Sequence, residues 1–151
     1  MRSLLLATLL ALGAASAGAA DLKIEGAWVR GTTPSQKATG AFMTLTSTGD
    51  AALVGAASPV AGKVEIHEMK MVGDTMKMGA IAKLPLPAGK PVELKPGSYH
   101  VMLLDLKKEM KEGSKVPLTL EIETGGKREQ VAVEAEVRPL GDASAHKHMQ
   151  H

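Results

Sequence analysis

Short stretches of alternating hydrophobic and polar residues, separated by turn residues, run through most of the chain. A period of two is typical of half-buried β-strands, whose successive side chains point to opposite faces. The predicted strands cover residues 22–30, 40–47, 53–57, 63–71, 76–78, 91–94, 99–106, 116–123 and 129–137, with an edge strand or extended loop at 81–87. Residues 51–59 admit a helix as a weaker alternative, and residues 107–114 could hold one helical turn. The pattern therefore predicts an all-β domain, either a β-sandwich or a small barrel.

The first twenty residues follow a different pattern. Met1-Arg2-Ser3 carries a positive charge, Leu4 to Leu12 is apolar, and Ala17-Gly18-Ala19 is a run of small residues. This order is typical of a secretory signal peptide, with cleavage after Ala19 or Ala20. The apolar run is too short to span a membrane. We therefore expect a periplasmic protein with a signal peptide at 1–20, a single domain at 21–140 and a flexible tail at 141–151.

Composition excludes several classes of function. The 151 residues include 18 Lys and Arg against 16 Asp and Glu, and the charges alternate instead of clustering. Neither a nucleic-acid surface nor a polybasic membrane patch is expected. The absence of cysteine excludes a thiolate nucleophile, a zinc–thiolate site and a blue-copper centre. Because aromatic residues are scarce, we expect an aliphatic core anchored by Trp28, the one tryptophan.

Histidine and methionine concentrate between residues 67 and 102. This window contains both internal histidines and five of the nine methionines. Strand alternation places His67 and Met69 on one face, and it places His100 and Met102 together in the same way. Imidazole nitrogens combined with thioether sulfurs select Cu(I) over zinc, calcium or magnesium. The window is therefore a candidate site for a soft metal ion.

A hairpin within this window would gather further sulfur atoms. A tight turn at residues 73–74 places Met71 opposite Met76 and Met69 opposite Met78. Four sulfurs would then share one face, and two lysines would oppose each other on the other face. A slip of one residue in the register would scatter the sulfurs, because it moves each side chain to the other face.

The spacing of four residues in this window resembles the signature of the periplasmic copper chaperone (PCuAC) family. His67 is followed after ten residues by Met78, after a further twenty-one by His100, and after one more by Met102. The flanking segments agree with the family at residues 27–30, 58–61, 67–69, 84–89 and 94–103. The resemblance covers roughly residues 22 to 140. Small departures, such as Gly97-Ser98 where two glycines are common, do not involve a proposed ligand.

The resemblance implies a cupredoxin-like Greek-key β-sandwich that binds one Cu(I) at an exposed site. The residues that match the ligands of the family are His67, Met78, His100 and Met102. The resemblance also implies delivery of copper toward the dinuclear centre in the copper-bearing subunit of cytochrome c oxidase, directly or with Sco-type copper proteins. We expect the chain to act as a monomer without stable membrane insertion.

The other methionines have less specific interpretations. Met69 is either a supporting or alternative ligand or a sulfur near the site. Met71 and Met76 are interpreted as exposed hairpin sulfurs or packing residues. Met43 is expected in the core, and Met110 on the surface or in a loop.

The C-terminal tail contains further metal-ligating side chains: His146, His148, Met149 and His151. A solvated tail without a role is one interpretation. A second copper site, including one for Cu(II), is the other, because Cu(II) prefers imidazole.

Three other classes of function compete with copper delivery. A copper enzyme or electron-transfer protein is disfavoured, because cysteine is absent and no nucleophile–base arrangement is evident; we therefore expect no enzymatic activity. Copper storage or resistance needs the same site as delivery, and the sequence does not separate them. A metal-free structural sandwich remains open, although the concentration of histidine and methionine opposes it.

Overall fold

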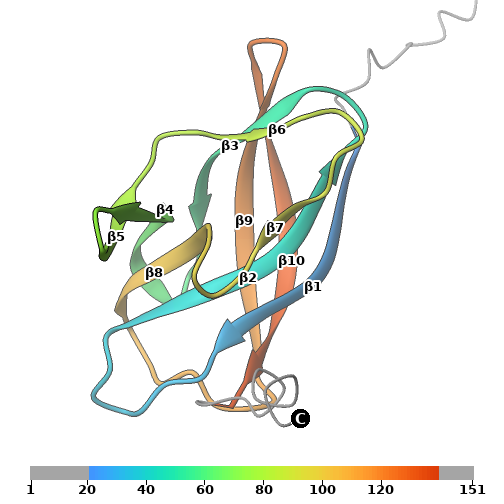
Figure 1. Ribbon diagram of the computed structural model, residues 1–151. Coiled ribbons are helices and arrows are strands. Elements are labelled where there is room, and N and C mark those ends of the chain that lie inside the picture. The colour runs from blue at the N-terminus through green and yellow to red at the C-terminus, as the bar shows by residue number, and fades with distance from the viewer. Residues whose placement is uncertain (1–20, 140–151) are drawn as a thin grey trace, which may run out of the picture.

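The computed structural model describes residues 21–139, and this part of the chain contains ten β-strands and no helix (Figure 1). The all-β prediction is therefore confirmed. The predicted signal peptide and the predicted tail at 141–151 lie outside the described residues. The strands are β1 (Leu22–Arg30), β2 (Ala38–Ser47), β3 (Ala51–Ala57), β4 (Ala61–Val72), β5 (Thr75–Ala80), β6 (Leu84–Leu86), β7 (Val92–Leu94), β8 (His100–Leu106), β9 (Lys115–Thr124) and β10 (Lys127–Arg138).

The strands form one hydrogen-bonded path that folds back on itself. Its order is β5-β4-β8-β2-β1-β10-β9-β3-β6, and β7 pairs with β2 beside this path. Neighbouring strands are antiparallel except β1 and β10, which run parallel. One cluster of buried residues contains side chains from β2, β4 and β8 as well as from β3, β9 and β10, so the two halves of the sheet pack face to face (Figure 1). This arrangement agrees with the predicted single-domain sandwich.

One hydrophobic cluster fills the space between the two halves. Leucine and valine provide most of its fully buried side chains, as expected from the scarcity of aromatic residues. The largest of these side chains are Leu45, Leu53, Leu86, Leu94, Leu103, Met110, Leu118, Leu120, Val29, Val101, Val116 and Val137. Because this core holds β4 and β8, it also fixes the strands that contain His67, His100 and Met102, whereas every residue of β5, which contains Met78, is exposed.

The hairpin register follows the prediction. Met71 pairs with Met76 and Met69 pairs with Met78, with the turn between β4 and β5 at residues 73–74. Gly73 has a φ of 62°, in the left-handed region that glycine enters without steric cost. The turn therefore sets the register, and the register gathers the sulfurs.

The prediction for Trp28 is wrong, and the prediction for Met110 is confirmed only in its location in a loop. Trp28 is half-buried and lies against the ring of Phe42 with 4.6 Å between centroids, outside the core cluster. Met110, expected on the surface or in a loop, does lie in a loop but is only 2% exposed. Its backbone amide donates a hydrogen bond to the Thr32 hydroxyl at 2.9 Å, and the Thr32 amide donates to the Met110 carbonyl at 3.0 Å. Paired backbone groups allow this loop to be buried.

Two further local expectations differ from the structure. Residues 107–114 form bends and a turn in place of a helical turn. Strict alternation along the predicted strand at residues 99–106 would place Asp105 on the buried face of Val101 and Leu103, but Asp105 is exposed with a φ of 51°, and Leu106 is buried beyond it. Aspartate is among the few residues that tolerate this left-handed backbone. No helix among residues 21–139 is long and apolar enough to cross a membrane.

Candidate metal centre

Strands β4 and β8 bring the two internal histidines together. In the antiparallel pairing, His67 lies directly opposite His100, and Glu65 lies directly opposite Met102. Side chains directly opposite each other project from the same face of a sheet. The centroids of the two imidazole rings are 5.5 Å apart, and the ring planes are inclined at 60°. Residues more than thirty positions apart in the chain are thus neighbours.

Strand β5 adds thioethers to the same face. Met78 lies opposite Met69, which is two residues beyond His67 on β4. Met78 is 50% exposed, whereas Met69 and Met102 are half-buried. The sulfurs therefore sit at the border between the folded domain and solvent, where an ion can be reached from outside.

A cavity of about 300 Å³ opens on this face. Four of the predicted site residues line it: Met69, Met78, His100 and Met102. The remaining lining residues are Arg30, Gln36, Ala38, Thr39, Gly40, Phe42, Pro96 and Gly97. His67 does not line this cavity but lies against the ring of His100. The structure thus places all four residues of the spacing signature in one region.

His67 has one nitrogen engaged and one unpaired. Its Nε2 atom lies 2.6 Å from the Glu65 carboxylate, which accepts a hydrogen bond from the ring N–H. Its Nδ1 atom is buried and, within the part of the chain that the structure describes, has no hydrogen-bond partner. A buried polar atom without a partner is costly. With Nε2 as the donor, Nδ1 offers a lone pair suited to a metal ion, in the carboxylate–histidine–metal arrangement common at metal sites.

His100 is prepared in the same way with the opposite nitrogen. Its Nδ1–H donates to the Ser98 carbonyl oxygen over 3.2 Å, so Nε2 keeps the lone pair. Burial lowers the pKa of His100 below its ordinary value of 6.5, and the nearby His67 and Arg30 lower it further, against the opposing effect of the Ser98 hydrogen bond. The ring is therefore held in the neutral form that binds metal.

Glu65 connects this face to the surface. Its carboxylate accepts the hydrogen bond from His67 and also pairs with Lys63 at 2.6 Å. These two hydrogen bonds hold the pKa of Glu65 below its ordinary value of 4.5, with the larger effect from His67. Glu65 therefore stays ionised and fixes the orientation of the His67 ring.

Sequence reasoning missed the aromatic wall of the cavity. Phe42 lies 6.2 Å from His100 between ring centroids, and the Arg30 guanidinium lies 5.7 Å from the Phe42 centroid. Gly40, which lies opposite Met102, leaves the space that the Phe42 ring occupies. A Cβ atom at position 40 would meet this ring at 2.8 Å. A glycine inside an alternating strand is a signal of such close approach. The contact between Glu65 and His67 could also have been predicted, since residues two apart on a strand share a face.

The donor set of the site combines two imidazoles with soft thioethers. No group of three or more His, Cys, Asp or Glu side chains that could hold a metal ion occurs among residues 21–139. Sites for calcium, magnesium or structural zinc are built from such groups. Thioethers with imidazoles are the alternative that the site offers, and they suit Cu(I).

The fold and the site together define a class: an all-β domain with imidazole and thioether donors on one sheet face. The chain belongs to the LpqE-like lipoprotein family, which matches residues 22–137. "Putative lipoprotein Lxx21020" from Leifsonia xyli subsp. xyli is 32% identical over 106 residues, which are 69% of this chain. The chain spans 63% of the length of that relative.

Solved PCuAC structures have the same fold. The apo PCuAC domain from PmoF1 is 26% identical with a TM-score of 0.65, covering 78% of this chain and 93% of the domain. Apo-DR1885 from Deinococcus radiodurans is 31% identical with a TM-score of 0.59, covering 92% and 96%. The Cu(I) form of DR1885 is 34% identical with a TM-score of 0.55, covering 75% of each chain. The resemblance to the PCuAC family is confirmed by these matches.

Proposed function

We propose that this protein is a periplasmic copper chaperone that binds one Cu(I) through His67, Met78, His100 and Met102. One observation carries the proposal: three of these side chains line one cavity, and His67 lies 5.5 Å from His100 between ring centroids. The similarity to DR1885, which has been solved with Cu(I), supports the choice of ion. Relatives described as lipoproteins support export to the cell envelope.

The geometry suits a carrier more than an enzyme. Two imidazoles and two thioethers are neutral ligands, so they stabilise Cu(I) less than thiolates would. A partner's ligands can replace them one at a time while the ion stays coordinated. As the recipient of the copper we propose the copper-bearing subunit of cytochrome c oxidase, with delivery either direct or through a Sco-type protein. No catalytic activity is part of this proposal.

A competition titration tests the proposal. The full chain is titrated with Cu(I) against a chromophoric chelator, beside His100→Ala/Met102→Ala and the tail variant His146→Ala/His148→Ala/His151→Ala. We expect one tight equivalent that the first variant loses and the tail variant keeps. Absence of tight binding in the full chain would favour a metal-free structural domain. Loss in the tail variant would assign the tight site to the tail.

A transfer assay then separates delivery from storage. The Cu(I)-loaded chain is mixed with the soluble copper domain of the oxidase subunit, and copper in each protein is measured after separation. Movement of copper to the oxidase domain is the expected result. Retention by the chaperone would contradict delivery, but the titration result would stand.

A further inference from the structure

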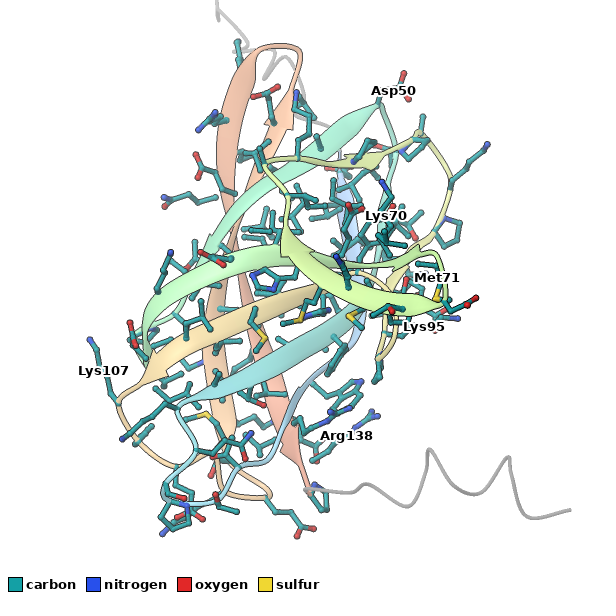
Figure 2. All side chains as sticks on the ribbon, turned by 60° about the vertical axis from the view of Figure 1, so that its left-hand side comes forward. Asp50, Lys70, Met71, Lys95, Lys107 and Arg138 are labelled. Carbon is teal, nitrogen blue, oxygen red and sulfur yellow. The ribbon has the colours of Figure 1, made fainter. Side chains whose placement is uncertain are left out.

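A second pair of methionines lies beyond the cavity on the same hairpin. Met71 and Met76 are directly opposite each other, and each lies two residues nearer the turn than Met69 and Met78. Because strand side chains alternate, all four thioethers project from one face. Met71 is 57% exposed and Met76 is 45% exposed. Figure 2 shows Met71 at the outer edge of the molecule, on the opposite side of the view from Lys107.

The exposure of this pair is not a general property of methionine in this protein. Met43 and Met110 are each 2% exposed, in keeping with the usual role of methionine as a filler of core gaps. The hairpin instead presents its sulfurs to solvent, and Lys70 and Lys77 oppose each other on its other face. Exposed thioethers gain nothing from burial, but they are available as ligands for soft metal ions.

The spacing allows the two pairs to share a sulfur. Directly opposed residues have Cβ atoms about 4.5–5.5 Å apart, and diagonal neighbours about 7–8 Å apart, within reach of long side chains. Met78 lines the cavity, yet it is also 50% exposed. Its flexible side chain therefore lies between the inner donors and the outer pair.

We propose that Met71 and Met76, with Met78 as a third donor, form an outer site for a soft monovalent cation, through which Cu(I) enters and leaves the cavity. The existence of the outer site follows from the hairpin register and the exposed sulfurs. The direction of movement rests on the proposed chaperone function. The outer site binds more weakly than the inner one, because thioethers alone surround the ion there.

Movement between the sites is a sequence of ligand exchanges. The ion at the outer site keeps its bond to Met78 while the sulfurs of Met71 and Met76 leave. The imidazole of His100 and the sulfur of Met102 take their places, so that each broken Cu–S bond is replaced by a Cu–N or Cu–S bond, and the imidazole of His67 then adds as the fourth ligand. Copper remains in the +1 state, and no oxidant, reductant or proton is required. Release to a partner is the reverse sequence.

Methyl NMR tests the outer site directly. The full chain, labelled with ¹³C at the methionine methyl groups, is titrated with Ag(I), a redox-inert analogue of Cu(I). We expect the first equivalent to shift the Met78 and Met102 signals, and further Ag(I) to shift Met71 and Met76. The buried Met43 and Met110 provide internal controls that stay in place. Met71 and Met76 signals that do not move in excess Ag(I) would overturn the outer site.

A pair of matched variants tests its role in transfer. Met71→Leu/Met76→Leu removes the two outer sulfurs but keeps apolar side chains of similar volume. Met43→Leu/Met110→Leu removes two sulfurs from the core by an equally conservative change. We expect the outer variant alone to slow Cu(I) uptake from a chelator several-fold, with no change in the affinity of the tight equivalent. Equal uptake rates in both variants would overturn the relay.

Failure of this inference is distinguishable from failure of the proposed function. A tight equivalent without movement of the outer signals would overturn the outer site and leave the chaperone proposal standing. Movement of the Met71 and Met76 signals without a tight equivalent would have the opposite meaning. It would establish the outer site and overturn the inner Cu(I) site.

Discussion

His67 and His100 face each other directly across β4 and β8, and each has one ring nitrogen held by a hydrogen-bond acceptor. The Glu65 carboxylate holds Nε2 of His67, and the Ser98 carbonyl holds Nδ1 of His100. Each ring therefore keeps a lone pair on its remaining nitrogen. Two imidazoles with fixed tautomers on one rigid sheet face lose little freedom when they bind an ion.

Removal of the Glu65 carboxylate should weaken Cu(I) binding. In Glu65→Ala, His67 loses the partner that orients its ring, and such changes next to metal ligands typically cost about 10–100-fold in affinity. Competition titration against a chromophoric chelator measures this change. Glu68→Ala is the matched control, because it removes a carboxylate from the opposite face of the same strand. Equal affinities for the two variants would contradict the role of Glu65.

The parts of the site that could be predicted from the sequence lie on single strands and one tight hairpin. Strand alternation places Met69 on the face of His67, and the turn at residues 73–74 sets Met78 opposite Met69. These relationships are local, so the sequence pattern contains them. The pairing of His67 with His100 is not local, and the resemblance to a family implied only that both residues are ligands.

The parts that could not be predicted depend on packing between distant segments. Phe42 reaches the cavity because β2 lies next to β8, and only the sheet order shows this. Met110 is buried because Thr32, far away in sequence, satisfies its backbone amide. Trp28 lies against Phe42, and the Arg138 guanidinium covers it 4.9 Å from its ring centroid. The expectation of a core position rested on the hydrophobicity of tryptophan alone, which does not show these two contacts.

A side chain at position 40 should disturb the packing of Phe42, which lines the cavity. In Gly40→Ala, the new Cβ atom meets the Phe42 ring at 2.8 Å, so that the ring or the strand must move. Overpacking of this kind costs about 1–3 kcal/mol. Chemical denaturation of the metal-free protein measures the loss. Gly79→Ala is the control, since nothing lies within 4 Å of a Cβ there; an equal loss in both variants would contradict the packing argument.

The stability of the metal-free protein should fall in mild acid. The pKa of His100 is lower in the folded protein than its ordinary value of 6.5, so the unfolded chain binds a proton first as the pH falls. The free energy of unfolding is therefore highest above pH 6.5 and decreases as the pH drops from 6.5 toward the folded pKa. Denaturation at a series of pH values measures this slope. His100→Asn should reduce it, and an unchanged slope would contradict the assignment to His100.

Stabilisation by metal ions should separate soft from hard cations. A ligand at 100 times its dissociation constant raises the free energy of unfolding by about 2.7 kcal/mol when it binds only the folded state. Ag(I) should therefore raise the unfolding temperature of the full chain. Calcium and magnesium should not, because the described residues contain no cluster of carboxylates and histidines for them. In His100→Ala/Met102→Ala, the effect of Ag(I) should largely disappear, because two ligands of the inner site are lost and the outer hairpin site, which remains, binds more weakly. A full effect of Ag(I) in that variant would place the stabilising site elsewhere in the fold.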